Sequence, residues 1–207
     1  MHTVLIADDH TLIRESLRNM LEPLDDFSIV ADVANGFDAL VAVKKWKPSV
    51  LLLDVAMPDA TGIEVVVDTQ RWSPQTKIII YTGVTSGAPL QQLIDSGIHG
   101  LLFKDSDSAH LIKALREVTH NHSYFDDKLS SVLAEQEAVG NLTEREKQVL
   151  SQILAGKTNR DIALLLNISI KTVDNHRTRL MNKLGAHSVS DLLRIAIKTG
   201  FIHPDTL

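Results

Sequence analysis

The hexapeptide Val4-Leu5-Ile6-Ala7-Asp8-Asp9 joins a short apolar run directly to two carboxylates, a pattern that indicates the class of fold. The arrangement recurs twice, since Asp54 follows the apolar residues 50–53 and Lys104 follows the apolar residues 101–103. Such runs indicate buried parallel strands, which places the charged side chains at the carboxyl ends of strands. Ligands bind at that edge of an open α/β sheet. Three carboxylates and one amine are costly to gather there without a cation, so the pattern predicts a divalent metal and a carboxylate with a chemical role.

Apolar runs alternate with segments of helical periodicity through about residue 120. Strands are expected at residues 4–7, 28–34, 50–53, 77–81 and 101–103. Helices are expected at residues 12–21, 36–45, 62–71, 90–95 and 109–119. Five βα units predict an α/β domain with a doubly wound, five-stranded parallel sheet and right-handed crossovers.

The composition is that of a globular protein, with 207 residues, 44% hydrophobic and 23% charged. There is no cysteine, which excludes a disulfide framework and a thiolate zinc site. No apolar run reaches the roughly 18 residues of a membrane span. The N-terminus enters a strand without the pattern of a signal peptide, so a cytoplasmic location without membrane contact is expected.

Charge is divided unevenly along the chain. From Leu142 to the end there are 10 basic and 6 acidic residues, which leaves 11 basic and 20 acidic residues in the rest. An acidic part joined to a basic part suggests two separate functions, and the basic part is suited to phosphate backbones. An imbalance of this size also arises by chance in solvated surfaces.

The second half of the chain is expected to be helical. Residues 121–141 are polar and irregular, which predicts a linker with a helical turn around residues 131–137. Four helix starts follow, marked by the capping residues Thr143, Thr158, Ser169 and Ser188. The second and third helices are joined by a tight turn and the third is basic, as in a helix-turn-helix. The predicted organisation is a domain at 1–120, a linker at 121–141 and a small all-α, four-helix domain at 142–207.

The acidic residues suggest a specific chemistry. We expect Asp8, Asp9 and Asp54 to hold Mg²⁺, a hard cation that prefers oxygen ligands, and Asp54 to be phosphorylated. Lys104 would be a second cation for the phosphoryl oxygens, and the Thr82 hydroxyl would donate a hydrogen bond to them. Alternatively, each Asp simply caps the turn or helix that follows it.

The first 120 residues resemble the receiver domain of response regulators, which has a flavodoxin-like fold. The matching residues are Asp8-Asp9, Asp54 with Met57-Pro58 and Gly62 after it, Thr82, and Lys104. The resemblance implies that Asp54 accepts the phosphoryl group and that Asp9 is a direct metal ligand, with Asp8 acting mainly through water. It also implies that the carbonyl of Ala56 is a ligand and that Thr82 and Lys104 sense the phosphate.

Two positions depart from the receiver pattern. Leu101 stands where the family usually has Tyr or Phe, an aromatic side chain that turns inward when the residue equivalent to Thr82 moves. Gly83 replaces the usual Ala, so the loop at residues 83–88 is expected to be mobile or an ordinary surface loop.

Residues 142–202 resemble the LuxR-type helix-turn-helix of NarL/FixJ regulators. The matching residues are Leu142, Thr143, Arg145, Glu146, Val149, Leu150, Gly156, Asn159, Ile162, Ala163, Leu166, Ser169, Lys171, Thr172, Val173, His176, Lys183, Leu184 and Gly185. Residues near the N-terminus of a recognition helix read bases in the major groove. The predicted DNA-contacting set is Lys171, Thr172, Val173, Asp174, Asn175, Arg177, Thr178 and Arg179.

Different members of this set suit different parts of DNA. Asn175 can bond an adenine edge and Asp174 a cytosine amine. The residues better suited to phosphates are Lys171, Thr172, Arg177 and Arg179. Asp174 would repel the backbone, so weak non-specific binding is expected. Val173 also has the spacing of a core residue, and the two arginines also fit a solvated helix face.

The expected function is a cytoplasmic, phosphorylation-controlled transcription factor of a two-component system. The expected partners are a histidine kinase, promoter DNA, a second copy of the chain on activation, and RNA polymerase. Enzymatic activity is expected only as phosphoryl transfer to Asp54 and its hydrolysis. Alternatives are a DNA-binding protein whose receiver is an interaction module, favoured by Leu101, and a metal-dependent hydrolase, for which the sequence offers no separate base.

Overall fold

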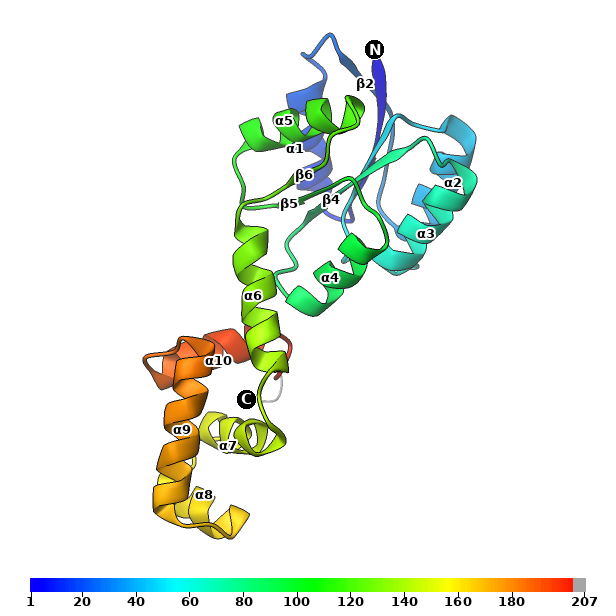
Figure 1. Cartoon of the computed structure of the whole chain (residues 1–207). Coiled ribbons are helices and arrows are strands. Elements are labelled where there is room, and N and C mark those ends of the chain that lie inside the picture. The colour runs from blue at the N-terminus through cyan, green and yellow to red at the C-terminus, as the bar shows by residue number, and fades with distance from the viewer. Residues whose placement is uncertain (203–207) are drawn as a thin grey trace. The chain divides into compact units, whose positions relative to one another are not determined.

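The computed structural model describes residues 1–202 (Figure 1). They form two compact units, and each has its own core. Met1–Val84 and Pro89–Leu129 make up the first unit, and the residues from Ser130 onward make up most of the second.

The first unit is built on a parallel sheet with the strand order β2-β1-β3-β4-β5-β6. Its strands are β1 (His2–Ala7), β2 (Phe27–Val33), β3 (Val50–Leu53), β4 (Lys77–Thr82), β5 (Gly100–Phe103) and β6 (Tyr124–Phe125). Its helices are α1 (Thr11–Leu21), α2 (Gly36–Trp46), α3 (Gly62–Trp72), α4 (Gly87–Asp95) and α5 (Ser108–Thr119). The predicted doubly wound α/β fold is confirmed, with the five expected strands in the expected places.

The sixth strand was not predicted. β6 is only two residues long and pairs with β5, Tyr124 opposite Gly100 and Phe125 opposite Leu101. Its polar surroundings in the sequence suggested a linker, because a two-residue strand carries no periodic pattern. Pairing with an edge already present in the sheet is what orders it.

Strand register brings the charged residues to one edge. Ala7 lies opposite Leu53, and Leu53 lies opposite Ile80, so β1, β3 and β4 end nearly level. The backbone N–H of Asp54 donates to the carbonyl of Ala7 at 2.8 Å, which extends the ladder one step beyond the strands. Asp8 and Asp54 therefore emerge from neighbouring strands at the same level.

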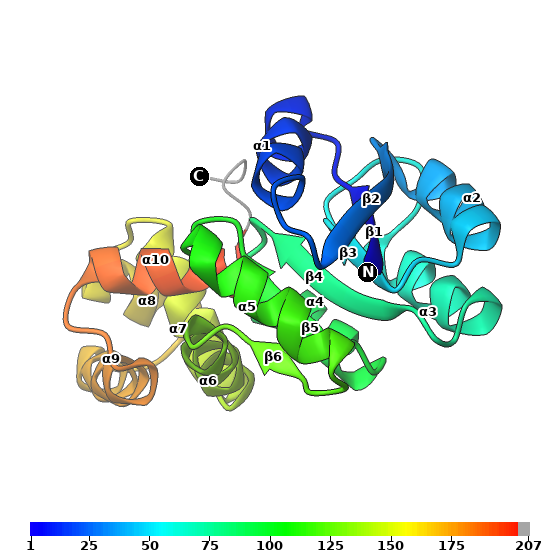
Figure 2. The ribbon, with the colours of Figure 1, turned by 90° about the horizontal axis from the view of Figure 1, so that it is seen from above.

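Helices cover both faces of this sheet (Figure 2). One buried cluster joins α1 and α5 to the strands, through Leu17 and Leu21 of α1 and Leu111 and Leu115 of α5. α2, α3 and α4 lie on the opposite face (Figures 1 and 2). Both faces of the central strand β3 are therefore covered, in agreement with its uninterrupted apolar sequence.

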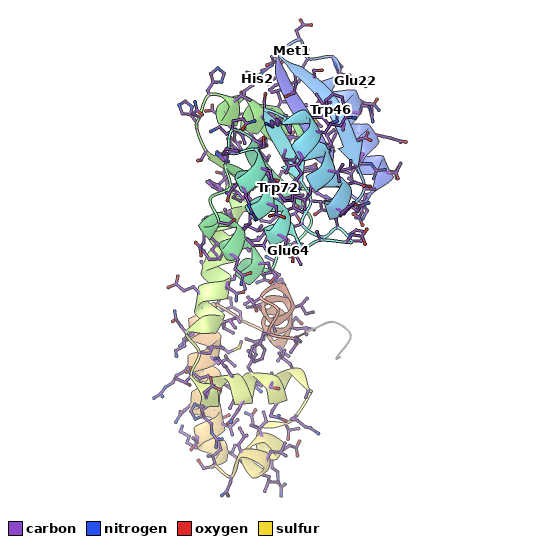
Figure 3. All side chains as sticks on the ribbon, turned by 90° about the vertical axis from the view of Figure 1, so that its right-hand side faces the viewer. Met1, His2, Glu22, Trp46, Glu64 and Trp72 are labelled. Atoms are coloured by element: carbon purple, nitrogen blue, oxygen red, sulfur yellow. The ribbon has the colours of Figure 1, made fainter. Side chains whose placement is uncertain are left out.

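The helices α2 and α3 lie side by side and end in tryptophans, Trp46 and Trp72 (Figure 3). The Lys44 ammonium group lies 3.2 Å from the centre of the Trp72 ring, a cation–π contact between the two helices. Lys44 lies in the last turn of α2 and Trp72 ends α3, so this contact joins the C-terminal ends of the two helices.

The second unit is helical. It comprises α6 (Lys128–Gly140, from Ser130), α7 (Glu144–Leu154), α8 (Asn159–Leu166), α9 (Ile170–Leu184) and α10 (Val189–Lys198). The four predicted caps are present, with Thr143, Thr158, Ser169 and Ser188 each accepting a hydrogen bond from the backbone N–H three residues on. The helices end where expected, at Gly156 and Gly185, whose φ angles are +73° and +59°.

The segment expected to be a linker is mostly the helix α6. It runs for 13 residues rather than a single turn. Val139 near its end is 7% exposed and belongs to the core formed with Val149, Ile162 and Leu180. The end of α6 is therefore a packed part of the second unit.

Within residues 1–202 no helix has the length and apolar character needed to cross a membrane.

Candidate functional site

Asp8, Asp9 and Asp54 meet at the carboxyl edge of the sheet. Asp8 and Asp54 are each 2% exposed, whereas the Asp9 side chain is 34% exposed. Burial of two carboxylates beside each other requires nearby cations or hydrogen-bond donors.

Lys104 supplies a cation to both buried carboxylates. Its Nζ atom lies 2.5 Å from Oδ2 of Asp54 and 2.7 Å from Oδ2 of Asp8. Burial alone would lower the pKa of Lys104, but the hydrogen bonds and charges of Asp54 and Asp8 outweigh it and raise that pKa. The ammonium group therefore stays protonated at neutral pH.

The other oxygen of Asp54 faces neutral donors. The Thr82 hydroxyl donates to Oδ1 at 3.0 Å, and the backbone N–H of Ala56 donates to the same atom at 3.1 Å. Thr82 is completely buried, and its own oxygen accepts a hydrogen bond from the N–H of Val84. The structure thus brings Asp54, Thr82 and Lys104 together, as the sequence predicted.

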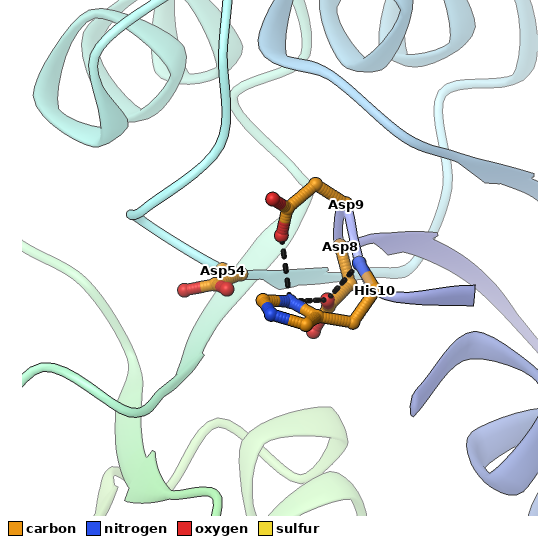
Figure 4. Close-up of side chains that lie close together, drawn as sticks. All are labelled: Asp8, Asp9, His10 and Asp54. Carbon is orange, nitrogen blue, oxygen red and sulfur yellow. Dashed lines mark hydrogen bonds and ion pairs between the residues drawn. The ribbon is translucent and has the colours of Figure 1, made fainter. Parts of the chain in front are cut away.

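His10 is a member of this cluster that the sequence reasoning missed (Figure 4). Its Nδ1 atom lies 2.7 Å from an oxygen of Asp9 and 3.2 Å from an oxygen of Asp8. Its position directly after the paired aspartates was a usable signal, because a residue only three positions beyond the strand end at Ala7 is still near the sheet edge. Possible ligand atoms of Asp8, Asp9, His10 and Asp54 all lie within 4.8 Å of one another.

The donor set fits a divalent cation with a preference for oxygen. Three carboxylates gather at this edge, and the Lys104 ammonium contacts two of them, those of Asp8 and Asp54. Asp54 and Ala56 line one shared cavity with His10 and Lys104. Hard cations such as Mg²⁺ are held by one or two carboxylates together with water, so these residues suit it.

Leu101 and Gly83, the two residues that depart from the receiver pattern, lie in different surroundings. Leu101 is fully buried in β5, so it is a core side chain. At Gly83, an added Cβ would meet no atom within 4 Å. The helix α4 begins at Gly87, three residues before its expected start, which shortens the loop after β4.

The helix-turn-helix consists of α8 and α9. Asn167 joins them with a left-handed backbone, φ +51°, and the Ser169 side chain caps α9. The basic and polar residues Lys171, Asp174, Asn175, Thr178 and Arg179 are exposed, and Thr172 and Arg177 are partly exposed.

The inclusion of Val173 among the DNA contacts was wrong. Its side chain is completely buried in the core with Leu180 and Leu184. The three residues recur at spacings of seven and four, which places them on the inner face of α9.

Two family models match the chain. Residues 4–116 match the response regulator receiver domain, and residues 140–196 match the LuxR family of bacterial regulatory proteins. The oxygen regulatory protein NreC of Staphylococcus aureus (strain JH9) is 33% identical over 210 residues, covering 94% of this chain and 96% of NreC.

Solved structures of RcsB are also similar. The RcsB–DNA complex has a TM-score of 0.67 at 27% identity, covering 95% of this chain and 98% of RcsB. RcsB of Salmonella enterica serovar Typhimurium, bound to the rprA promoter with the phosphomimetic BeF₃⁻, has a TM-score of 0.61 at 28% identity, covering 94% and 98%. The chain therefore belongs to the NarL/FixJ family of two-component response regulators, DNA-binding regulators of transcription with a receiver and a LuxR-type domain.

Proposed function

We propose that a histidine kinase phosphorylates Asp54 and that this controls DNA binding. The observation that carries the proposal is the set of three groups on one buried carboxylate: the Lys104 ammonium, the Thr82 hydroxyl and the Ala56 N–H. All three can stabilise negative charge on oxygen.

The transfer needs little covalent chemistry from the protein. An Asp54 oxygen forms a bond to phosphorus while the N–P bond of the kinase phosphohistidine breaks, and the released imidazole takes up a proton. Mg²⁺, held by Asp8, Asp9, Asp54 and the Ala56 carbonyl, would supply charge neutralisation at the phosphoryl oxygens. Lys104 would move from the carboxylate to a phosphoryl oxygen, and Thr82 would donate to another.

The receiver's own chemistry would end with hydrolysis of its aspartyl phosphate, without turnover of an outside substrate. We propose no general enzymatic role beyond this, because the three groups that contact Asp54 suit transfer and hydrolysis of its own phosphate. The protein would act in the cytoplasm, where it meets the kinase and promoter DNA.

Phosphorylation would favour a dimer that binds an inverted repeat. A receiver phosphate can act only by stabilising one of two states that already exist. RcsB, a similar protein, is described as two dimers bound to two DNAs. Val189 and Ile197 on α10 are exposed and apolar, and they offer a surface for pairing the DNA-binding units. RNA polymerase would be a further partner at the promoter.

The first test is intact mass after incubation with acetyl phosphate, with and without Mg²⁺. We expect wild type to gain one phosphoryl group only with Mg²⁺, and Asp54→Asn to gain none. Asp59→Asn, an exposed aspartate in the same loop, is the matched control and should behave as wild type.

A second function remains as a specific alternative, in which the receiver is an interaction module that is never phosphorylated. Buried Leu101 favours it, since no aromatic side chain is available at that position to turn inward. Absence of labelling by acetyl phosphate and by candidate kinases would support this alternative. Equal promoter affinity of phosphorylated and unphosphorylated protein would contradict control by phosphorylation.

A further inference from the structure

The side chain of Asn159 connects the two helices of the helix-turn-helix. Its Nδ2 atom donates to Oδ1 of Asp174 at 2.6 Å, and its Oδ1 atom accepts from Nη1 of Arg177 at 3.0 Å. Asn159 is the first residue of α8, and the other two residues lie on α9. One amide thus satisfies an anion with its donor end and a cation with its acceptor end.

Asp174 and Arg177 would otherwise be partners. They are three residues apart on one helix, a spacing at which opposite charges commonly pair. Within residues 1–202, however, no ion pair joins them, and each instead bonds to Asn159. The amide therefore keeps the carboxylate and the guanidinium apart.

This separation affects what Arg177 can offer to DNA. A guanidinium has five N–H donors, and the bond to the amide oxygen of Asn159 uses one on Nη1. A direct bidentate pair with Asp174 would use two donors and neutralise the charge. The hydrogen bond to the neutral Asn159 side chain leaves the positive charge of Arg177 in place and holds the guanidinium in a defined orientation.

We propose that Asn159 is a positioning residue for DNA recognition, which holds Asp174 away from Arg177 so that the guanidinium can bind a phosphate or a guanine edge. The proposal rests on the proposed use of α9 as the recognition helix. Without the amide, Asp174 pairs with Arg177 and withdraws it from DNA. The loss of DNA affinity on removal of the Asn159 side chain therefore depends on the presence of Asp174.

The experiment uses the full-length protein, phosphorylated with acetyl phosphate. Wild type first selects its preferred site from a random DNA library, and affinities for that site are measured by fluorescence anisotropy. The variants are Asn159→Ala, Asp174→Ala, Arg177→Ala, the double variant Asn159→Ala/Asp174→Ala, and the control Asn182→Ala. Asn182 is an exposed asparagine later on the same helix α9.

We expect Asn159→Ala to weaken binding about tenfold, the loss typical of one good arginine contact. Arg177→Ala should weaken binding as much, and Asn182→Ala should match wild type. The double variant should bind the site with an affinity within about threefold of that of Asp174→Ala, because the carboxylate that competes for Arg177 is gone. Thermal melts of each variant check that the second unit is folded.

Two results would overturn the proposal. One is an Asn159→Ala protein that binds as wild type does, and the other is a double variant as weak as Asn159→Ala although its melt is normal. A wild-type protein that enriches no DNA sequence at all would instead contradict the proposed role of α9 in recognition, before the variants are compared.

Discussion

The Nζ atom of Lys104 lies 2.5 Å from Oδ2 of Asp54, although the two residues are 50 positions apart in the chain. Lys104 is 15% exposed and also contacts the buried carboxylate of Asp8. One ammonium group therefore offsets the repulsion between two carboxylates in the unphosphorylated protein.

Replacing Lys104 by Met should destabilise the receiver by about 3 kcal/mol at neutral pH without Mg²⁺, because two buried carboxylates lose their cation. Urea denaturation measures the change. Mg²⁺ should recover more stability in this variant than in wild type, since it binds the same carboxylates. Lys128→Met, which breaks an exposed pair with Asp105, should cost much less stability than Lys104→Met. Equal losses for the two variants would contradict this account.

Replacing either of two glycines beside the site by alanine should change the stability of the receiver to different extents. At Gly62 a new Cβ would lie 2.6 Å from Cβ of Val55, the residue after Asp54, so Gly62→Ala should destabilise the receiver by about 1–3 kcal/mol. At Gly83 a new Cβ meets nothing within 4 Å, so Gly83→Ala should be neutral or slightly stabilising. Chemical denaturation gives the free energy of unfolding of both variants. A Gly62→Ala protein as stable as wild type would contradict the prediction and show that the loop after Asp54 can move to accept the new Cβ.

Glu146 should make the stability of the second unit depend on pH. Burial alone raises its pKa, but hydrogen bonds from Lys183 and Thr143 outweigh burial and lower the pKa to about 2 from its ordinary 4.5. A carboxyl with a lowered pKa contributes stability that is fully present above pH 4.5 and is lost as the pH falls toward 2.

The corresponding measurement is denaturation of wild type and Glu146→Gln at pH 5.5 and pH 3. The wild-type advantage should be on the order of 2 kcal/mol at the higher pH and clearly smaller at the lower one. Glu144→Gln removes a carboxylate in the same helix turn that is 85% exposed. The stability of this variant should match that of wild type at both pH values. A Glu146→Gln difference that is constant with pH would refute the assigned shift.

Lys171 should contribute to DNA affinity through phosphate. It is exposed on the first turn of α9, and its ammonium group suits a non-specific backbone contact. Lys171→Ala should weaken binding to all sequences alike and reduce the slope of log affinity against log salt by about 1. Anisotropy titrations at several salt concentrations give the slope, with Lys113→Ala on α5 as an unaffected control. An unchanged slope would place Lys171 away from the backbone.

Local pattern was enough to predict most elements of the fold. The strand β3 and the start of α3 were placed to the residue, because an uninterrupted apolar run and a glycine mark them. The caps at Thr143 and Ser169 were likewise readable, since capping depends on residues three positions apart. The strand β6 and the length of α6 were missed, because their order comes from pairing and packing with distant residues.

Short-range periodicity in the sequence places the strand ends that carry Asp8, Asp54 and Lys104 and the helix that carries Arg177. Which of these groups meet depends on tertiary contacts between distant parts of the chain. The contact of Thr82 with Asp54 spans 28 positions, and that of Asn159 with Arg177 spans 18. Strand register and helix packing set such distances, and no local pattern encodes them.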